Sequence, residues 1–136
     1  MPKQIILDTG CITLLLGKKP PKQILNLFES IENSKNTAYI ITPVISEVYK
    51  HLCIRKGKDF ASSSLISVMD RYPIVLIDQD ISLLFKAGEL KCRYRTKLSY
   101  IDCFVVAAGL LYHWEIHTTE KNLPDIPHLK IITYQF

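Results

Sequence analysis

Five short apolar runs alternate with longer segments of helical periodicity, and this alternation constrains the fold more than any other feature of the chain. Short apolar runs between turn residues predict β-strands, whereas apolar residues spaced three and four apart predict amphipathic helices. Strands that alternate with helices indicate an α/β domain, with a largely parallel sheet of about five strands and helices on both faces. The predicted strands are Lys3–Leu7, Ala38–Ile41, Ile74–Ile77, Glu115–Thr118 and Lys130–Tyr134.

Length and composition agree with one domain spanning residues 1–136. Of the 136 residues, 48% are hydrophobic and 22% are charged, which is enough to bury a single core without disulfides. The four cysteines lack the paired spacing of a zinc site, so we expect reduced and mostly buried thiols. Neither a signal peptide nor an apolar segment of bilayer-spanning length is visible, so we expect a cytoplasmic protein without a membrane partner.

Two of the predicted helices carry start signals. Thr42 is predicted to be the N-cap of one helix, with Pro43 at the first helical position. Glu47 follows within that helix, beside its apolar stripe, so we expect this carboxylate to be partly buried. Ser99 is predicted to start the most apolar helix of the chain.

Acidic residues are placed where a parallel sheet would bring them together. Asp8 follows the first predicted strand directly, Asp102 lies in the first turn of the helix that Ser99 starts, and Glu120 follows the fourth strand. In open α/β sheets, functional sites form beyond the carboxyl ends of the strands. We therefore expect these three carboxylates, joined by Glu47, to converge at one edge of the sheet.

Each acid also has a simpler structural explanation. Asp8 can cap the helix that follows it, and Ser99 with Asp102 has the Ser-x-x-Asp spacing of a capping box. Glu47 can form a salt bridge with a basic neighbour on its own helix. Capping does not require four carboxylates at strand ends in one chain, so their joint placement favours a site.

Four segments, taken in order, resemble the motifs of the PIN domain family. They are IILDTGCITLLL, TPVISEV, LSYIDCFVVAAGL and HTTEKNL, and the similarity extends over nearly the whole chain. PIN domains are small three-layer α/β/α nucleases whose acids bind a divalent metal, and many are toxins of VapC-type toxin–antitoxin pairs. The resemblance thus implies ribonuclease activity on RNA, and for a toxin-type member it also implies an antitoxin partner and a homodimer.

The resemblance also implies roles for individual residues. The residues that match the family's four acids are Asp8, Glu47, Asp102 and Glu120. Thr118 matches the threonine of the family's Thr-x-Asp motif, in which Glu120 replaces the usual aspartate. Gly10 stands where the family usually has Ser or Asn, so Thr9 is a candidate source of the missing hydroxyl. Leu123 stands where Phe is usual.

A cluster of carboxylates of this kind predicts a divalent metal ion. Crowded carboxylates repel one another and would partly protonate without a neutralising cation. Oxygen ligands favour hard ions such as Mg²⁺, with Mn²⁺ as a substitute. The hypothesis is an endoribonuclease in which the ion activates water for in-line attack on a phosphodiester. Asp8 and Asp102 are the predicted direct ligands, with Glu47 as a ligand or base and Glu120 as an outer or second-metal ligand.

A basic segment, residues 91–97, precedes the helix that Ser99 starts. Its candidate RNA-contacting residues are Lys91, Arg93, Tyr94, Arg95 and Lys97. Basic side chains can neutralise phosphates, and an aromatic ring can stack on an unpaired base. A solvated surface loop or a frayed helix end explains the segment equally well, because the net charge of the chain is only +4.

Two other functions compete with the nuclease. A phosphatase of the haloacid dehalogenase type also places Asp after its first strand, but it needs a second Asp where this chain has Gly10. Nucleotide-binding folds are disfavoured because neither glycine-rich phosphate motif is present. The second alternative is a catalytically weak RNA-binding or protein-interaction scaffold of the same fold, which the departures at Gly10, Glu120 and Leu123 keep open.

Overall fold

The computed structural model describes residues 1–136 as five strands and six helices. The strands are β1 (Lys3–Leu7), β2 (Asn36–Ile41), β3 (Val75–Ile77), β4 (Glu115–Thr118) and β5 (Ile131–Thr133). The helices are α1 (Thr9–Leu15), α2 (Lys22–Glu32), α3 (Thr42–Lys56), α4 (Lys58–Arg71), α5 (Ile81–Tyr94) and α6 (Tyr100–Tyr112). All strand pairs are parallel, which confirms the predicted α/β class and sheet.

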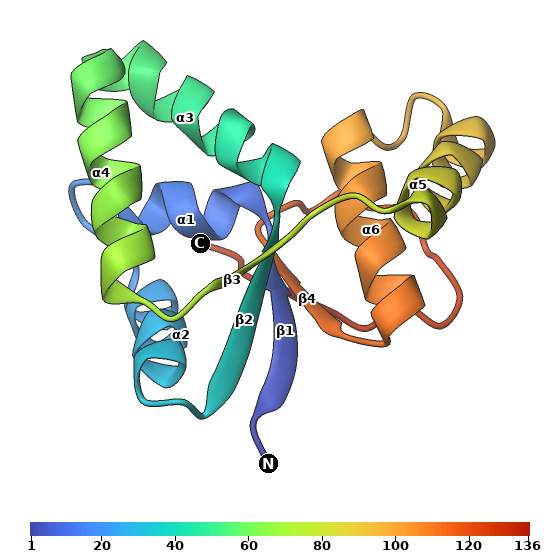
Figure 1. Cartoon of the computed structure of the whole chain (residues 1–136), viewed down its shortest axis with the longest axis horizontal. Coiled ribbons are helices and arrows are strands. Elements are labelled where there is room, and N and C mark those ends of the chain that lie inside the picture. Colours follow the sequence, from blue (N-terminus) through green and yellow to red (C-terminus); the bar gives the residue numbers. More distant parts are fainter.

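The helices lie on both sides of the sheet, with α1 to α4 on one side and α5 and α6 on the other (Figure 1). Thirty buried apolar residues form the core between these layers. The central strand β1 contributes Ile5, Ile6 and Leu7, which have no exposed surface, as expected for a strand covered on both faces. None of the helices has both the length and the apolar character that a membrane span requires.

The strand order β3-β2-β1-β4-β5 places the end of β1 at the centre of the sheet. The chain moves outward from β1 through β2 to β3, and it then crosses over to form β4 on the other side of β1. The carboxyl ends of β1 and β4 are therefore adjacent at the point where the order reverses. This switch point is where open parallel sheets form ligand sites.

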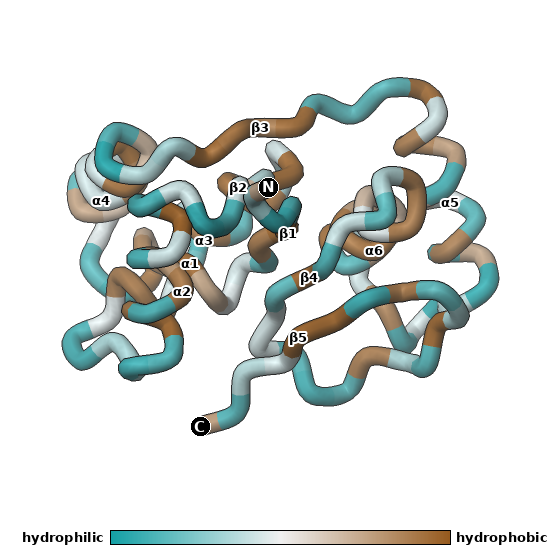
Figure 2. The backbone as a smooth tube through the Cα atoms, turned by 90° about the horizontal axis from the view of Figure 1, so that it is seen from below, coloured by the Kyte–Doolittle hydropathy of each residue, from teal (hydrophilic) through white to brown (hydrophobic).

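β3 corrects one prediction, because it is an exposed edge strand instead of a buried one. Val75 and Leu76 are 46% and 47% exposed, although β3 pairs with β2 as a parallel strand. Figure 2 shows this apolar segment crossing between the α4 and α5 sides of the molecule, at the β2 edge of the sheet. An apolar run alone does not distinguish a central strand from an edge strand.

The start of α3 corrects a second prediction. The N-cap position is Ile41, without a side-chain cap, and Thr42 is already helical. The Thr42 hydroxyl instead accepts a hydrogen bond from Gln79 Nε2 at 2.8 Å. The threonine therefore links the ends of β2 and β3 and does not cap the helix.

The cysteines are all free, as predicted, but fewer of them are buried than expected. Cys11 and Cys103 are buried, Cys53 is half-buried and Cys92 is exposed. Burial raises the pKa of the Cys11 thiol to about 12. Cys11 is therefore a protonated core residue and not a nucleophile.

Candidate functional site

Asp8 and Thr118 meet at the switch point of the sheet. Asp8 follows β1 and is 8% exposed, and its backbone N–H donates to the His117 carbonyl of β4 at 3.0 Å. One carboxylate oxygen accepts from the Thr9 N–H at 2.7 Å, which caps α1. The other accepts from the Thr118 hydroxyl at 2.7 Å. The Asp8 side chain therefore caps α1 and also lies in the site, and it is held by the first residue of α1 and by the last residue of β4.

Asp102 reaches the same edge from the N-terminus of α6. Ser99 and Asp102 form the predicted capping box: the Asp102 N–H donates to Ser99 Oγ at 3.1 Å, and the Ser99 N–H donates to the Asp102 carboxylate at 3.2 Å. Ser99 thereby fixes the direction of the Asp102 side chain. The capping interpretation is confirmed, and it does not exclude Asp102 from the site.

Glu47 and Glu120 complete the set of acids with less support from neighbouring groups. Glu47 is partly buried on α3, as predicted, and it forms no salt bridge with Lys50 or His51. Glu120 is exposed, and its backbone N–H donates to Thr118 Oγ1 at 3.0 Å. Thr118 therefore positions both Asp8 and the backbone that carries Glu120. Leu123, the departure in the same motif, packs against the core.

The four acids line one pocket, here called the acid pocket, with a volume of about 200 Å³. All of its lining residues are non-hydrophobic: Asp8, Thr9, Gly10, Thr13, Glu47, His51, Asp102, Thr119 and Glu120. The expected convergence of the four carboxylates is thus present in the structure. Larger pockets of about 540 and 390 Å³ lie elsewhere, and they contain none of these acids.

The carboxylates of the acid pocket perturb one another. Burial raises the pKa of Asp8 to about 6, against the effect of its two hydrogen bonds, and repulsion from Asp102 and Glu47 adds to the rise. Burial also raises the pKa of Asp102, with repulsion from Glu120 and Glu47 adding to it. The pocket is therefore a place where negative charge is destabilised and a cation would relieve the repulsion.

The donor set of the acid pocket fits a hard divalent ion that keeps part of its water shell. All four acids offer oxygen donors, which Mg²⁺ and Mn²⁺ prefer. No three of the His, Cys, Asp and Glu side chains stand in an arrangement that would enclose one ion. Mg²⁺ is commonly bound through one or two carboxylates, with waters and substrate phosphates as its other ligands. An open, acid-lined pocket suits such an ion better than a closed protein cage.

Three residues of the acid pocket were not singled out from the sequence, namely Thr13, His51 and Thr119. His51 lies one turn after Glu47 on α3, and this four-residue spacing was the signal that could have placed it at the site. Thr119 comes from the loop after β4, and no sequence pattern marks it. Its side chain occupies the space beside Gly10, where a Cβ atom would collide with Thr119 Oγ1. This approach explains why the chain has glycine at position 10.

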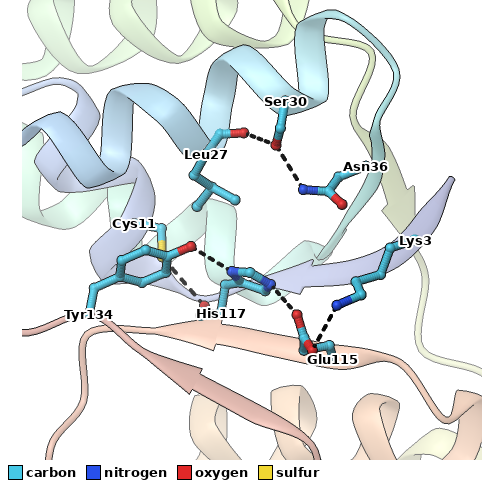
Figure 3. Close-up of polar contacts among 8 residues, drawn as sticks. All are labelled: Lys3, Cys11, Leu27, Ser30, Asn36, Glu115, His117 and Tyr134. Carbon is cyan, nitrogen blue, oxygen red and sulfur yellow. Dashed lines mark hydrogen bonds and ion pairs between the residues drawn. The ribbon is translucent and has the colours of Figure 1, made fainter.

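A polar network on β4 supports the strand that carries Thr118 (Figure 3). His117 is buried, with Nε2 2.8 Å from Glu115 Oε1 and Nδ1 2.7 Å from the Tyr134 hydroxyl. A carboxylate only accepts hydrogen bonds, so Nε2–H donates to Glu115 and Nδ1 accepts from Tyr134. Burial lowers the pKa of His117, which agrees with a neutral ring. His117 therefore has a structural role.

The basic segment is the end of α5 and the turn that follows it. Lys91 Nζ donates to the carbonyl oxygens of Arg95 and Leu98 at 2.6 and 2.7 Å, so Lys91 closes the C-terminal end of this helix. Arg93, Arg95 and Lys97 are exposed. The three exposed cations remain candidates for RNA contact, whereas Lys91 has a structural role.

A family comparison matches nearly the whole chain. The model of the PIN domain family matches residues 5–129. Comparison with the curated proteins gives no match to the sequence.

Solved structures of toxin–antitoxin proteins are similar to this chain in fold. VapBC2 from Rickettsia felis, bound to a DNA fragment from its promoter, has a TM-score of 0.79 at 21% identity, covering 97% of this chain and 99% of that chain. DNA-bound VapBC from Salmonella typhimurium has a TM-score of 0.74 at 17% identity, covering 98% of both chains. VapC20 from Mycobacterium tuberculosis, a sarcin–ricin loop cleaving toxin, has a TM-score of 0.67 at 16% identity, covering 82% of this chain and 86% of that chain.

Proposed function

The chain belongs to the PIN domain family, and on this premise we propose that it is a Mg²⁺- or Mn²⁺-dependent endoribonuclease of the toxin–antitoxin type. The observation that carries the proposal is the acid pocket, in which four carboxylates from different elements converge at the switch point of the sheet. The similarity to VapC20, a sarcin–ricin loop cleaving toxin, supports RNA as the substrate. We also propose that the protein acts in the cytoplasm.

The proposed roles follow from how each acid is held. Asp8 and Asp102 are the ligands of the divalent ion, because hydrogen bonds fix both side chains in place. Glu47 has no hydrogen-bond partner of its own and is free to orient the attacking water as an acceptor. Glu120, which is exposed, would contact the ion through the water shell that the ion keeps. A bound divalent ion supplies charge neutralisation at the phosphate and a water that is more acidic than bulk water.

Cleavage of a single-stranded RNA by the wild type and by Asp102→Asn tests this proposal. The wild type is expected to cleave with Mg²⁺ or Mn²⁺ and not with EDTA, leaving 5′-phosphate and 3′-hydroxyl ends. Loss of a ligand carboxylate should cost several kcal/mol of transition-state stabilisation, which is a rate decrease of roughly 100-fold or more. Asp70→Asn, an exposed position on α4, is the control. Equal cleavage in EDTA, or full activity of Asp102→Asn, would refute the proposal.

We also propose an antitoxin partner, since the similar structures from Rickettsia felis and Salmonella typhimurium are of VapBC and a third is a toxin–antitoxin complex from Klebsiella pneumoniae. A pocket of carboxylates would attract a lysine or arginine of that partner in place of the metal. Co-expression with a candidate antitoxin should therefore block cleavage, and excess Mn²⁺ should partly restore it. An antitoxin that binds tightly without reducing cleavage would contradict this arrangement.

A homodimer is the remaining part of the proposal. Apolar side chains are exposed on the neighbouring elements β3 and α5, namely Val75, Leu76, Ile81, Leu84 and Phe85. Large exposed apolar patches mark interaction sites, and we propose that these side chains form one. Light scattering should give a dimer for the wild type and for Ile66→Glu on α4, and a monomer for Phe85→Glu. A dimer in all three would exclude this surface.

The scaffold function stays as the second candidate because no three side chains are arranged to enclose one ion. The two candidates differ in their response to metal. A bound ion stabilises the folded state, so Mn²⁺ should raise the melting temperature of the wild type and leave that of Asp8→Asn unchanged. No shift in either protein would favour the scaffold.

A further inference from the structure

One wall of the acid pocket carries hydroxyl groups that metal binding does not explain. Thr9, Thr13 and Thr119 all line the pocket. The Thr13 hydroxyl is already used, because it donates to the carbonyl oxygens of Thr9 and Gly10 at 3.3 and 3.1 Å. Thr9 is only 6% exposed, and its Oγ1 is buried without a hydrogen-bond partner. The hydroxyl of Thr119 makes no hydrogen bond within the protein.

The backbone is arranged around the Thr119 hydroxyl. A Cβ atom at position 10 would collide with Thr119 Oγ1 and would lie 3.0 Å from Thr119 Cβ. A side chain at position 10 would therefore force the Thr119 hydroxyl out of its present position. Glycine leaves this space to a hydroxyl that comes from the loop after β4.

The chemistry of the pocket indicates what these hydroxyls bind. The ionised carboxylates only accept hydrogen bonds, and so do the oxygens of a phosphodiester. An anionic phosphate that enters this pocket needs hydrogen-bond donors in addition to a cation. The side chains with a donor left over are Thr9, Thr119 and the imidazole of His51. A buried hydroxyl without a partner, as in Thr9, is itself the mark of a group that a ligand or water completes.

We propose that Thr119 is a substrate-binding residue whose hydroxyl donates a hydrogen bond to a non-bridging oxygen of the RNA phosphodiester. This inference rests on the proposed ribonuclease function. In this arrangement the threonine hydroxyl contacts the phosphate oxygens of the substrate, and the carboxylates contact the ion.

Removal of the hydroxyl tests the donor. Thr119→Val keeps the shape of the side chain and loses the hydroxyl, whereas Thr119→Ser keeps the hydroxyl. A hydrogen bond to a charged group corresponds to a decrease in kcat/KM of roughly 10- to 100-fold for Thr119→Val, with Thr119→Ser close to the wild type. Mn²⁺ should raise the melting temperature of all three proteins equally, because no metal ligand has changed. Equal kcat/KM for valine and threonine would overturn the inference.

A second pair of variants moves the hydroxyl from residue 119 to residue 10 and tests whether its position in the pocket is what matters. Gly10→Ser alone should be inactive, because the new side chain collides with Thr119. Combined with Thr119→Gly, the same serine has room, and RNA cleavage should recover at least tenfold over Gly10→Ser. The matched double variant Gly10→Ala with Thr119→Gly fills the same space without a hydroxyl and should not recover. Equal activity of the two double variants would show that only packing matters, which overturns the inference.

Sulfur substitution identifies the substrate atom. Replacing one non-bridging oxygen of the cleaved phosphodiester by sulfur weakens it as a hydrogen-bond acceptor. The wild type should be slowed more than Thr119→Val by one of the two sulfur diastereomers in Mn²⁺. Identical sulfur effects in both proteins would overturn the contact while leaving the nuclease intact. A wild type that neither binds nor cleaves RNA would refute the proposed function itself, and the inference with it.

Discussion

Replacing Asp8 by asparagine is expected to stabilise the metal-free protein at neutral pH. The pKa of Asp8 is raised from 3.8 to about 6, chiefly by burial. Each pKa unit corresponds to about 1.4 kcal/mol, so keeping Asp8 ionised in the folded state costs about 3 kcal/mol. The amide of the Asp8→Asn variant would keep one carbonyl oxygen and so lose one of the two hydrogen bonds that Asp8 accepts, at a cost of about 1–2 kcal/mol.

The net effect on Asp8→Asn is a gain of about 1–2 kcal/mol, or roughly 3–7 °C in melting temperature for a chain of this size. The sign depends on pH. Between pH 3.8 and about 6 the folded protein binds more protons at Asp8 than the unfolded chain, so stability falls as the pH rises through this range. Below this pH range the destabilisation by ionised Asp8 is absent, and above it the destabilisation reaches its full value.

Urea denaturation in EDTA at pH 4 and pH 7.5 measures this prediction. The wild type should lose up to about 3 kcal/mol more than Asp8→Asn between the two pH values. Asp70→Asn, at an exposed position of α4, controls for the removal of one negative charge. We predict that ionised Asp8 destabilises the folded protein. An Asp8→Asn protein that is less stable than the wild type at pH 7.5, with the same pH dependence, would refute this prediction.

Three further predictions concern the elements around the site. Ser99→Ala should cost about 1 kcal/mol in thermal denaturation through loss of the capping box, and Ser99→Thr should restore it; no loss would mean that the box does not support α6. Gly109→Ala should cost about 1–3 kcal/mol, because its Cβ would lie 2.7 Å from Ile116 Cδ1, whereas Gly88→Ala, with open space around it, should stabilise by up to about 1 kcal/mol; the opposite order would contradict the packing. Replacing the three exposed basic residues of the basic segment by glutamine should reduce the salt dependence of RNA binding by about 0.7 in log–log slope per lost phosphate contact, and an unchanged slope would remove the segment from the RNA path.

The parts of the site that follow from local patterns could be predicted from the sequence. Asp8 follows an apolar run, and the Ser99–Asp102 spacing is a local device that works within four residues. Both side chains lie where these patterns place them. The order of strands and helices also follows from periodicity, which sets the sheet and its carboxyl edge.

The parts that depend on distant segments could not be predicted. The collision between a side chain at position 10 and Thr119 involves residues 109 positions apart, and no local pattern encodes it. Likewise, β3 has the composition of a buried strand and is an edge strand because of the strand order. The hydroxyl of Thr42 had two potential partners, its own helix and Gln79, and only the tertiary arrangement selects between them.

The most direct test of the proposed metal site is the position of Mn²⁺ in crystals of the wild type soaked with that ion. We expect an anomalous peak in the acid pocket, with carboxylate oxygens of Asp8 and Asp102 at direct-ligand distance and no such peak in Asp8→Asn. Metal-free density in the pocket at saturating Mn²⁺, or an ion bound without either aspartate, would contradict it.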